Sequence, residues 1–380
     1  MYLAAAVEPF GHEVKIVDLA GNPRWKETVS NLDADLFGIT CVTPNVKVVR
    51  EISLLLPKGK PIVIGGVHPT FLPQDTLEQI RCDAIVQGEG EIVIKKLIHD
   101  LEQGNLKRTY RGRLVPVAAI PKPARHLVTL SKYSPGGQST TPIYTSRGCP
   151  YRCNFCSKIT AQTYRTFPLE RVLDEMEEVM KFGYRSILFG DDDIGIQPDR
   201  LKNMLKAIMP LRVNFRLNQD ARQIDEEMLI FAAKAGCSEI SFGIESGSQK
   251  MLDLMNKHTT VEANRRAILE TKKHGIKAKA YFVVNFPGED ERTIIETLKF
   301  VEETKPDKWL LSSFAPLPGS DTFRRPRHYG ITWMSSAWED YYLVGTDGQF
   351  KPCFETKELT LERQTHFHEV LHRGLKGMIG

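Results

Sequence analysis

The chain has 380 residues, enough for two domains that each bury a core. Its 51 Lys and Arg residues against 47 Asp and Glu leave a net charge of +4 that is spread along the chain, which favours an organic substrate of small or medium size and no nucleic acid. Seven cysteines, no N-terminal signal and no apolar run of membrane-spanning length indicate a cytoplasmic protein with neither a disulfide scaffold nor a transmembrane segment.

The first hundred residues alternate short apolar runs with helix-like segments. The runs are rich in β-branched residues, end in turn residues, and cover residues 13–19, 36–42, 61–66 and 84–88. Helix-like segments between them include residues 45–56 and 91–102. This βαβ alternation predicts an α/β, Rossmann-like domain with a doubly wound parallel sheet over residues 1–105.

Polar or glycine-rich loops follow three of these runs, at residues 43–45, 65–70 and 88–91. Ligands of doubly wound sheets bind at the carboxyl ends of the strands. Together the loops resemble those of a cobalamin-binding domain, and the resemblance implies that Gly65, Gly66 and His68 contact cobalamin. Taken alone, the two glycines would also suit turns at the ends of strands. For His68, a structural role in holding the turn of its own loop is favoured over cobalt ligation.

Two features depart from that domain's pattern. Residues 2–8 resemble its first helix, so the strand that should precede this helix is missing and the domain is N-terminally truncated. The Asp-x-His-x-x-Gly motif that ligates cobalt in some such domains is also absent. Without the missing strand, the runs at 13–19 and 36–42 must pair directly with each other, or one of them is left as an unpaired edge strand of the sheet. We therefore expect weak cobalamin binding by the chain as written, and a true start that lies upstream.

A proline-rich stretch of weak periodicity follows, at residues 106–141. It contains Pro116, Pro121, Pro123, Pro135 and the pair Gly136-Gly137. Such a composition predicts a linker between two domains.

Cys149, Cys153 and Cys156 then form a Cys-x3-Cys-x2-Cys loop. Three thiolates in one loop indicate a metal centre, and a four-iron four-sulfur cluster with three protein ligands keeps one iron open. A closed zinc site would need a fourth ligand, for which His126 is the nearest candidate. A redox dithiol would use Cys153 and Cys156 but leave Cys149 without a role.

The spacing of the cysteines, the Arg-Gly before them and Phe155 before the last one resemble the radical S-adenosylmethionine (radical SAM) family. The resemblance implies that the three cysteines hold a 4Fe-4S cluster whose open iron binds S-adenosylmethionine near Phe155. It implies reductive cleavage of that cofactor to methionine and a 5′-deoxyadenosyl radical, which takes hydrogen from the substrate. A reducing electron donor such as flavodoxin or ferredoxin is expected.

Six apolar runs, with helical segments between them, begin at this motif. They cover residues 142–146, 185–189, 212–217, 238–243, 279–285 and 308–314. Six βα units predict a partial (β/α)6 barrel over residues 142–325, with its chemistry at the carboxyl ends of the strands. Residues 326–380 form a C-terminal extension with only Cys353, too few thiolates for a second cluster.

Acidic and glycine-rich tips follow the barrel strands. Gly190, Asp191 and Asp192 stand where the radical SAM family often has Gly-Gly-Glu, and the resemblance implies that these carboxylates pair with the methionyl ammonium of S-adenosylmethionine. The sequence does not show which of Asp191 and Asp192 pairs with the ammonium. For Asp193 the alternative role is to cap the next helix.

Three further positions are site candidates. Glu245 resembles the residue that meets the ribose or the amino group of the nucleoside, and Pro287-Gly288 resembles the segment whose backbone lies against adenine. Arg216 is a cation inside an apolar strand, so it should pair with a carboxylate or a ligand. A structural ion pair is favoured over a substrate contact, since charged residues are seldom buried unpaired.

The resemblance implies a cobalamin-associated radical SAM methyltransferase, and its most concrete reaction is methylation of an unactivated carbon. One alternative is a cobalamin-independent radical SAM oxidoreductase, cyclase or dehydratase with a vestigial first domain. Another is a non-catalytic iron-sulfur or zinc-binding module. Such a module would not need acidic and glycine-rich tips on four further strands.

Overall fold

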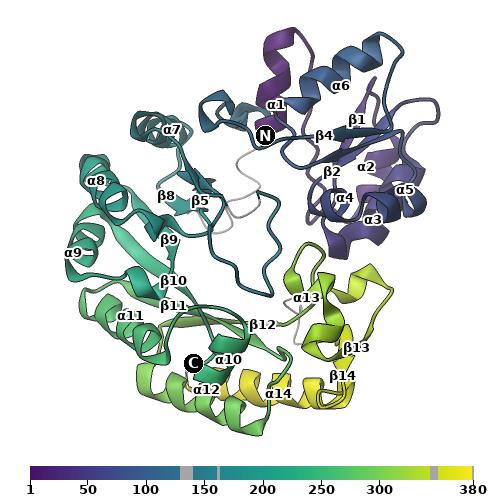
Figure 1. Cartoon of the computed structure of the whole chain (residues 1–380). Coiled ribbons are helices and arrows are strands. Elements are labelled where there is room, and N and C mark those ends of the chain that lie inside the picture. Colours follow the sequence, from purple (N-terminus) through teal and green to yellow (C-terminus); the bar gives the residue numbers. More distant parts are fainter. Residues whose placement is uncertain (129–139, 161–162, 343–349, 379–380) are drawn as a thin grey trace.

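The computed structural model describes residues 1–128, 140–160, 163–342 and 350–378. Its framework is two parallel sheets, one of four strands and one of six. Figure 1 shows the N-terminal sheet and its helices (purple to blue) beside an arc of alternating strands and helices (teal to green), and the C-terminal segment returns to the N-terminal unit. The elements therefore follow one another around a ring, and the α/β class is confirmed.

The N-terminal sheet has the order β1-β2-β3-β4, with parallel neighbours throughout. Its strands are β1 (Phe37–Thr40), β2 (Ile62–Gly65), β3 (Ala84–Gln87) and β4 (Thr109–Arg111). Its helices are α1 (Tyr2–Val7), α2 (Trp25–Ser30), α3 (Val46–Leu55), α4 (Val67–Phe71), α5 (Pro73–Gln79) and α6 (Val93–Glu102). The strands predicted at 36–42, 61–66 and 84–88 are confirmed. Their β-branched side chains are buried, as in Ile62, Ile64 and Ile85, because helices cover the sheet.

The strand predicted at residues 13–19 is not formed. The segment has no regular secondary structure, and it pairs with no strand of the described residues. A parallel strand needs a hydrogen-bonded neighbour, yet β1 pairs only with β2 and lies at the edge of the sheet. Of the two expected outcomes, direct pairing of 13–19 with 36–42 is therefore wrong, and among the described residues β1 is left as an edge strand. Alternate residues of the unpaired segment, such as Lys15 and Val17, are exposed.

The fourth strand lies inside the stretch predicted to be a linker. β4 adds to β3 with Ile85 beside Thr109 and Val86 beside Tyr110. Farther along, Arg125 Nη2 lies 2.7 Å from Oε1 of Glu175, and both side chains are buried. Much of this stretch is thus ordered against the two sheets. Pro135 and the pair Gly136-Gly137 lie outside the described residues.

The second sheet confirms all six predicted barrel strands. They are β5 (Thr140–Ile143), β8 (Ser186–Phe189), β9 (Asn214–Gln219), β10 (Cys237–Glu245), β11 (Lys277–Val284) and β12 (Lys308–Ser313). Each strand pairs in parallel with the next along the chain, and β5 and β12 lie at the two edges. The outer helices are α7 (Leu169–Lys181), α8 (Pro198–Ile208), α9 (Glu226–Ala235), α11 (Val261–Lys273) and α12 (Glu291–Thr304), with the short α10 (Gln249–Leu254) after β10. This is the predicted partial (β/α)6 barrel.

The two faces of the barrel sheet differ in polarity. Phe215, Leu217 and Phe242 are fully buried within the hydrophobic core that includes the helices. Residues alternate between the faces of a strand, so Arg216 and Lys279 stand on the opposite, inner face, where both are partly exposed. The apolar runs thus mark the outer face, and the inner wall is polar.

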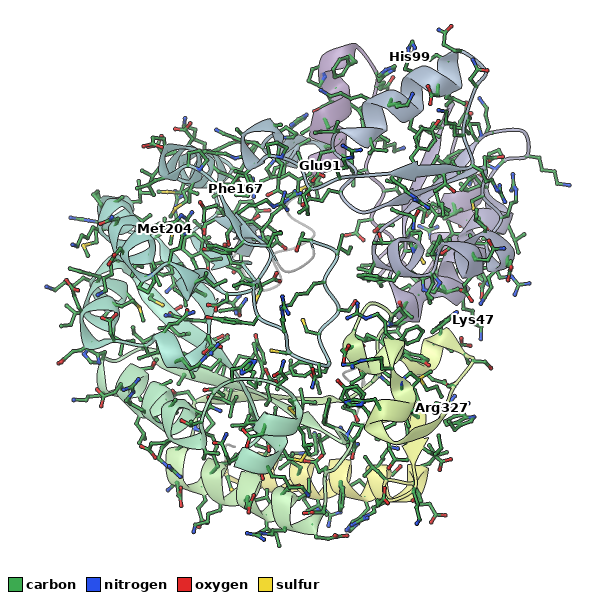
Figure 2. The ribbon with its side chains drawn as sticks, in the orientation of Figure 1. Lys47, Glu91, His99, Phe167, Met204 and Arg327 are labelled. Atoms are coloured by element: carbon green, nitrogen blue, oxygen red, sulfur yellow. The ribbon has the colours of Figure 1, made fainter. Side chains whose placement is uncertain are left out.

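The C-terminal extension closes the ring. It comprises β13 (Ile331–Met334), β14 (Phe354–Thr356) and α14 (Leu361–Met378), and the short α13 (Asp321–Arg324) lies just before it. Trp338 Nε1 donates to Asp75 Oδ2 over 3.0 Å, and Lys47 Nζ lies 3.3 Å from Glu339 Oε1. In Figure 2, Lys47 stands at this junction and Glu91 at the other junction of the N-terminal unit. In the part of the chain that the structure describes, no helix has the length and apolar character needed to cross a membrane.

Candidate active site

A short antiparallel strand pair closes the cysteine loop. β6 (Ser146–Arg147) pairs with β7 (Arg165–Thr166) on either side of it. Cys149 is buried, Cys153 and Cys156 are partly exposed, and all seven cysteines of the chain are free thiols. Burial raises the pKa of the Cys156 thiol to about 12, and Cys153 and Cys149 raise it as well. The three sulfurs are therefore near enough to act on one another electrostatically.

The donor set fits a four-iron cluster and does not fit a single ion. In the described ranges no three His, Cys, Asp or Glu side chains are grouped so that they could hold one metal ion. Tetrahedral zinc requires such convergence, and His126, the candidate fourth ligand, instead contacts Glu8 Oε1 at 2.7 Å. In a four-iron cluster each thiolate binds its own iron, so the three thiols of this loop would hold three irons and leave the fourth open.

The loop is fixed against the end of α10 and the segment that follows β12. Asn154 donates there twice, from its backbone N to Met255 O and from its Nδ2 to Leu254 O, each over 2.9 Å, and its own carbonyl accepts from Asp321 N over 3.1 Å. Ser157 Oγ donates to Pro318 O over 2.5 Å. Phe155 is partly buried and packs against the main core. These contacts hold the loop in place without a metal.

Buried ion pairs join the loop to the N-terminal sheet. Arg147 Nη2 lies 2.6 Å from Glu91 Oε1, and Arg147 Nη1 lies 3.3 Å from Glu89 Oε1. Arg165 contacts Glu89 as well, at 2.5 Å, and Val115 N donates to that carboxylate over 2.5 Å. Glu89 and Glu91 belong to the loop after β3 that the sequence assigned to cobalamin. Their side chains are committed to the junction between the two sheets.

The acidic tip after β8 separates into distinct roles. Asp191 is buried and accepts hydrogen bonds from Thr145 N at 3.1 Å, from Thr145 Oγ1 at 2.9 Å and from Ser146 Oγ. Burial raises the pKa of Asp191. Asp192 is exposed and has no hydrogen bond or ion pair with any described residue. The geometry thus distinguishes the two acids: Asp191 anchors the start of β6 and the residue before it, and Asp192 is the one open to a ligand.

Two neighbours of these acids are explained by local structure. Asp193 Oδ1 accepts from Gly195 N over 3.0 Å, which confirms the predicted cap. Its other oxygen, Oδ2, is buried with no partner in the described chain. Burial and the nearby Asp220 raise the pKa of Asp193 to about 6. A Cβ on Gly190 would lie 2.8 Å from the Tyr144 ring, so packing accounts for this glycine.

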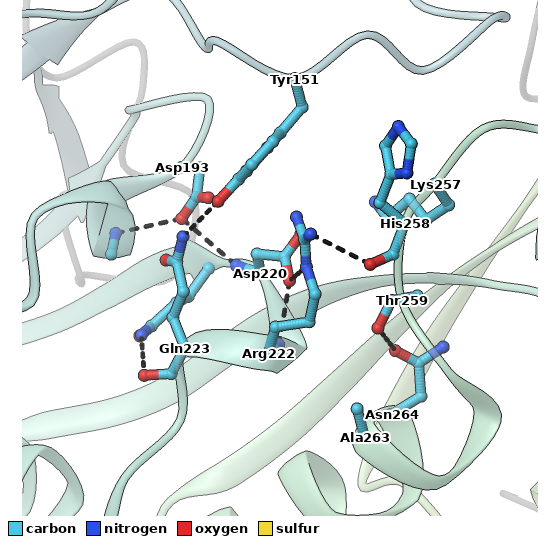
Figure 3. Close-up of polar contacts among 12 residues, drawn as sticks. Tyr151, Asp193, Asp220, Arg222, Gln223, Lys257, His258, Thr259, Ala263 and Asn264 are labelled. Atoms are coloured by element: carbon cyan, nitrogen blue, oxygen red, sulfur yellow. Dashed lines mark hydrogen bonds and ion pairs between the residues drawn. The ribbon is translucent and has the colours of Figure 1, made fainter.

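Figure 3 shows a polar cluster that sequence reasoning missed. Gln223 Nε2 donates to Tyr151 OH over 2.6 Å, and Arg222, whose guanidinium lies 4.4 Å from the Tyr151 ring centroid, pairs with Asp220 at 2.9 Å. Gln223 Oε1 and Gln219 Oε1 are buried without a described partner, like Asp193 Oδ2. Three orphaned acceptors favour a ligand rich in donors. Only the position of Tyr151 within the cysteine loop could have signalled this cluster.

Glu245 ends β10 in a left-handed conformation, with φ 62°, that is uncommon for a non-glycine residue. Its Oε1 lies 2.8 Å from Lys257 Nζ, and both side chains are largely buried. Burial opposes the charge on Lys257, but Glu245 and Cys153 outweigh it and raise the pKa of the lysine. A Cβ on Gly243 would lie 2.7 Å from this Nζ, so the glycine makes room for the lysine. Lys257 is a second residue that the sequence did not single out.

The segment after β11 places its glycine against the protein itself. Gly288 has φ 97°, and a Cβ there would lie 2.6 Å from Leu254 Cδ1 on α10. Pro287 precedes it at the carboxyl end of the strand. Packing against Leu254 accounts for this glycine, and the predicted contact with adenine stays a prediction.

At the first sheet the three predicted cobalamin contacts differ. His68 is fully buried, with Nδ1 3.3 Å from Thr43 Oγ1 and Nε2 2.9 Å from Asp75 Oδ2, so both ring nitrogens are engaged. This geometry supports the loop-holding role and leaves no nitrogen for cobalt. Gly66 has φ 107°, and a Cβ there would lie 2.7 Å from Cys41 O, so it is a turn glycine. Gly65 has open space: a Cβ would meet only Val86, at 4.0 Å.

The ion pair predicted for Arg216 is not formed. Glu239 lies beside it in register on β10, but Glu239 Oε2 contacts Lys308 Nζ at 2.6 Å. Within the described residues the Arg216 guanidinium has no hydrogen bond and no ion pair. The expectation of a structural ion pair is wrong, because the Glu239 carboxylate pairs with Lys308 on β12, two strands from β10.

Comparisons with known proteins match both parts of the chain. Residues 143–301 match the model of the radical SAM superfamily, and residues 1–98 match that of the B12 binding domain. An uncharacterized methyltransferase of Pyrococcus horikoshii is 29% identical over 95% of this chain and 83% of its own length. An anaerobic magnesium-protoporphyrin IX monomethyl ester cyclase of Rubrivivax gelatinosus is 30% identical over 85% of this chain, which spans 65% of that relative.

Solved structures agree on the fold. The radical SAM methyltransferase TsrM from Kitasatospora setae superposes with a TM-score of 0.74, covering 98% of this chain and 85% of TsrM, at 19% identity. The shared arrangement spans the N-terminal sheet, the barrel and the extension. At this identity the likeness concerns the fold alone.

Proposed function

We propose that this chain, which belongs to the radical SAM superfamily and carries an N-terminal B12 binding domain, methylates an unactivated carbon of an organic substrate. The radical SAM domain implies a 4Fe-4S cluster and S-adenosylmethionine, and the B12 domain implies cobalamin. When bound, these groups supply the electron, the hydrogen-abstracting radical and the methyl group. The class of enzyme is that of its relatives, several of which are named methyltransferases.

The observation that supports cobalamin dependence is the junction of the two sheets. Arg147, two residues before Cys149, is held by Glu89 and Glu91 of the loop at the carboxyl end of β3. The ligand-binding edge of the first sheet therefore adjoins the cysteine loop. A vestigial first domain would not need to hold the cysteine loop through buried charges, each of which is costly unless it is paired.

In this proposal Cys149, Cys153 and Cys156 hold the cluster. Asp192 receives the ammonium of S-adenosylmethionine, because it is the unpaired carboxylate of the tip. Glu245 and Lys257 together fix the end of β10 under the loop, and the free acceptor of Asp193 takes a donor of the same ligand.

Residues at the edge of the first sheet hold cobalamin without ligating cobalt through His68. Space lies over Gly65, and Val42 at the end of β1 leaves an apolar side chain exposed. Cobalamin fits as a group laid against this edge. The backbone of Pro287-Gly288 is proposed to border adenine from the β11 side.

The setting that we propose is the cytoplasm, with flavodoxin or ferredoxin as electron donor. Seven free thiols and an oxygen-sensitive cluster suit a reducing compartment. A second candidate reaction is ring closure, because a cyclase is among the relatives at 30% identity.

The test uses the full chain reconstituted without oxygen. The missing strand led us to expect weak cobalamin binding, but β4 gives the N-terminal sheet a fourth strand, so we now propose that cobalamin remains bound after gel filtration. S-adenosylmethionine with a deuterated methyl group should label the product, whereas a cyclase would form an unlabelled ring. Replacing Cys149, Cys153 and Cys156 by Ala should remove the visible absorbance of the cluster, and replacing Cys237 and Cys353 should not. Iron retained by the triple variant, or a chain that elutes free of cobalamin, would contradict the proposal.

A further inference from the structure

The inner wall of the barrel carries two cations without anionic partners. On β9 the buried Phe215 and Leu217 face the helices, so Arg216 faces the inner side. On β11 the buried Ala278 and Ala280 likewise put Lys279 on that side. Both cations are partly buried. Neither side chain has a role in the proposed cluster, S-adenosylmethionine or cobalamin sites.

The carboxylate nearest to Arg216 in the sheet is already neutralised. Glu239 is its register neighbour on β10, and its side chain is only 5% exposed. Glu239 pairs with Lys308 at 2.6 Å and has no charge left to offset Arg216. The guanidinium is therefore a net positive charge in the wall.

Lys279 likewise has no acidic register neighbour. Its register neighbours are Ser241 on β10 and Lys308 on β12. Its Nζ lies 5.0 Å from the ring centroid of Tyr281, two residues farther toward the carboxyl end of β11. The ammonium thus leans toward the end of the barrel where the cysteine loop lies. In the described residues it forms no ion pair.

On β10, which lies between the two cation-bearing strands, the inner face carries the paired Glu239 and, two residues farther on, Ser241. Asn218 and Ser241 are register partners, and Ser241 is in turn beside Lys279. Partly buried charges without partners are unfavourable. A guanidinium, an ammonium and a hydroxyl along one wall are donors suited to an oxyanion. The wall is therefore complementary to a negatively charged group.

We propose that Arg216 and Lys279 bind a carboxylate or phosphate group of the organic substrate. This inference rests on the proposed function, since it places the substrate inside the barrel. Arg216 stands three residues before Gln219, the last residue of β9, so its Cα lies about 10 Å below the carboxyl end of the strand. The charged group is then the end of the substrate that is remote from the reacting carbon.

The test measures anion binding to the cluster-loaded protein by calorimetry at low salt. The probes are inorganic pyrophosphate and glutarate, with dimethyl glutarate as the uncharged control. We expect saturable binding of at least one anion and none of the diester. Arg216→Gln and Lys279→Gln should each weaken it roughly tenfold, and the double variant roughly a hundredfold. Tighter binding of pyrophosphate would identify a phosphate, and tighter binding of glutarate a carboxylate.

A matched variant controls for net charge. Arg266 on α11 and Lys234 on α9 are exposed on outer helices, so Arg266→Gln with Lys234→Gln should leave anion binding unchanged. Cluster absorbance and S-adenosylmethionine affinity are measured on the same samples and should persist in the Arg216/Lys279 double variant. Equal anion binding by that variant, or no binding by the unaltered protein, would overturn the inference while leaving the proposed function standing. Loss of S-adenosylmethionine affinity together with anion binding would also overturn it, because the pair would then serve the cofactor.

Discussion

Arg147 Nη2 lies 2.6 Å from Oε1 of Glu91, which ties the residue two places before Cys149 to the loop after β3. Glu89 shares the contact and also holds Arg165. The cluster loop is thus supported by charges from another sheet. Its geometry depends on the N-terminal unit as well as on the barrel.

Glu89→Gln should destabilise this junction. It leaves the partly buried Arg165 without its counter-charge and Arg147 with Glu91 alone, and breaking a fully buried ion pair costs at most about 3 to 5 kcal/mol. We expect a lower midpoint of thermal unfolding and faster loss of cluster absorbance in air. Glu102→Gln, at an exposed position beside His12, is the control and should change neither. A cluster of normal lifetime in the Glu89 variant would show that the junction does not support the loop.

Asp192→Asn should lower the affinity for S-adenosylmethionine, whereas Asp191→Asn should lower the stability of the fold. The Asp192 variant should fold normally and bind S-adenosylmethionine about 10 to 100 times more weakly, because a charge-assisted contact is lost. The Asp191 variant should lose stability, since an Asn amide opposes the donors Thr145 and Ser146, at roughly 1 to 3 kcal/mol per unsatisfied group. Calorimetry and thermal unfolding on both proteins check this ranking. Equal affinities would make Asp192 a turn residue only.

Lys257→Gln should expose the dependence of the site on Glu245. The substitution leaves the Glu245 carboxylate buried at a left-handed position without its cation. We expect S-adenosylmethionine affinity to fall by about one to two orders of magnitude, as also for Glu245→Ala. Lys250→Gln removes an exposed lysine that pairs with Asp290 and serves as the matched control. An affinity loss of the same size in that control would assign the effect to net charge.

Glu289 should make the protein less stable as pH rises. Burial raises the pKa of this carboxyl to about 8, above its ordinary value, so the folded chain holds a proton that the unfolded chain releases. The stabilising contribution is complete below about pH 4.5 and is lost as pH rises through 8. Glu289→Gln keeps an acceptor for Asn285 N and should flatten this slope, with a higher unfolding midpoint at pH 8.5 than the unaltered chain. Parallel pH profiles for the two proteins would contradict this.

The barrel was predictable because each strand has a local signature. An apolar run indicates a strand that is buried against the helices, and a polar tip after it indicates the end that faces a ligand. Strands such as β9 and β11 could therefore be located from the sequence. The cysteine spacing carries its chemistry within eight residues. Asp193 could likewise be recognised as a cap, because capping is a contact between near neighbours.

What the sequence could not show depends on distant partners. Lys257 follows a short helix and has no motif, and its role arises from Glu245, twelve residues away. The sequence predicted a ligand-binding loop at Glu89 and Glu91, and only the structure shows that Arg147 and Arg165 pair with them. The strand at 13–19 was wrongly predicted because its residues suit a strand while no neighbour pairs with it. Arg216 shows the converse: an ion pair was expected for it, but the carboxylate beside it, that of Glu239, pairs with Lys308 instead.

The contact of Trp338 with Asp75 has a consequence for biosynthesis. The two residues are 263 positions apart, and translation delivers the N-terminal unit long before the extension. All six barrel strands are complete while the ring is still open at this side, so a nascent chain can accept bulky cofactors that the finished enzyme then retains. A Trp338→Leu protein, which lacks the donor that fastens the extension, should accordingly exchange bound cobalamin for free cobalamin faster than the unaltered enzyme.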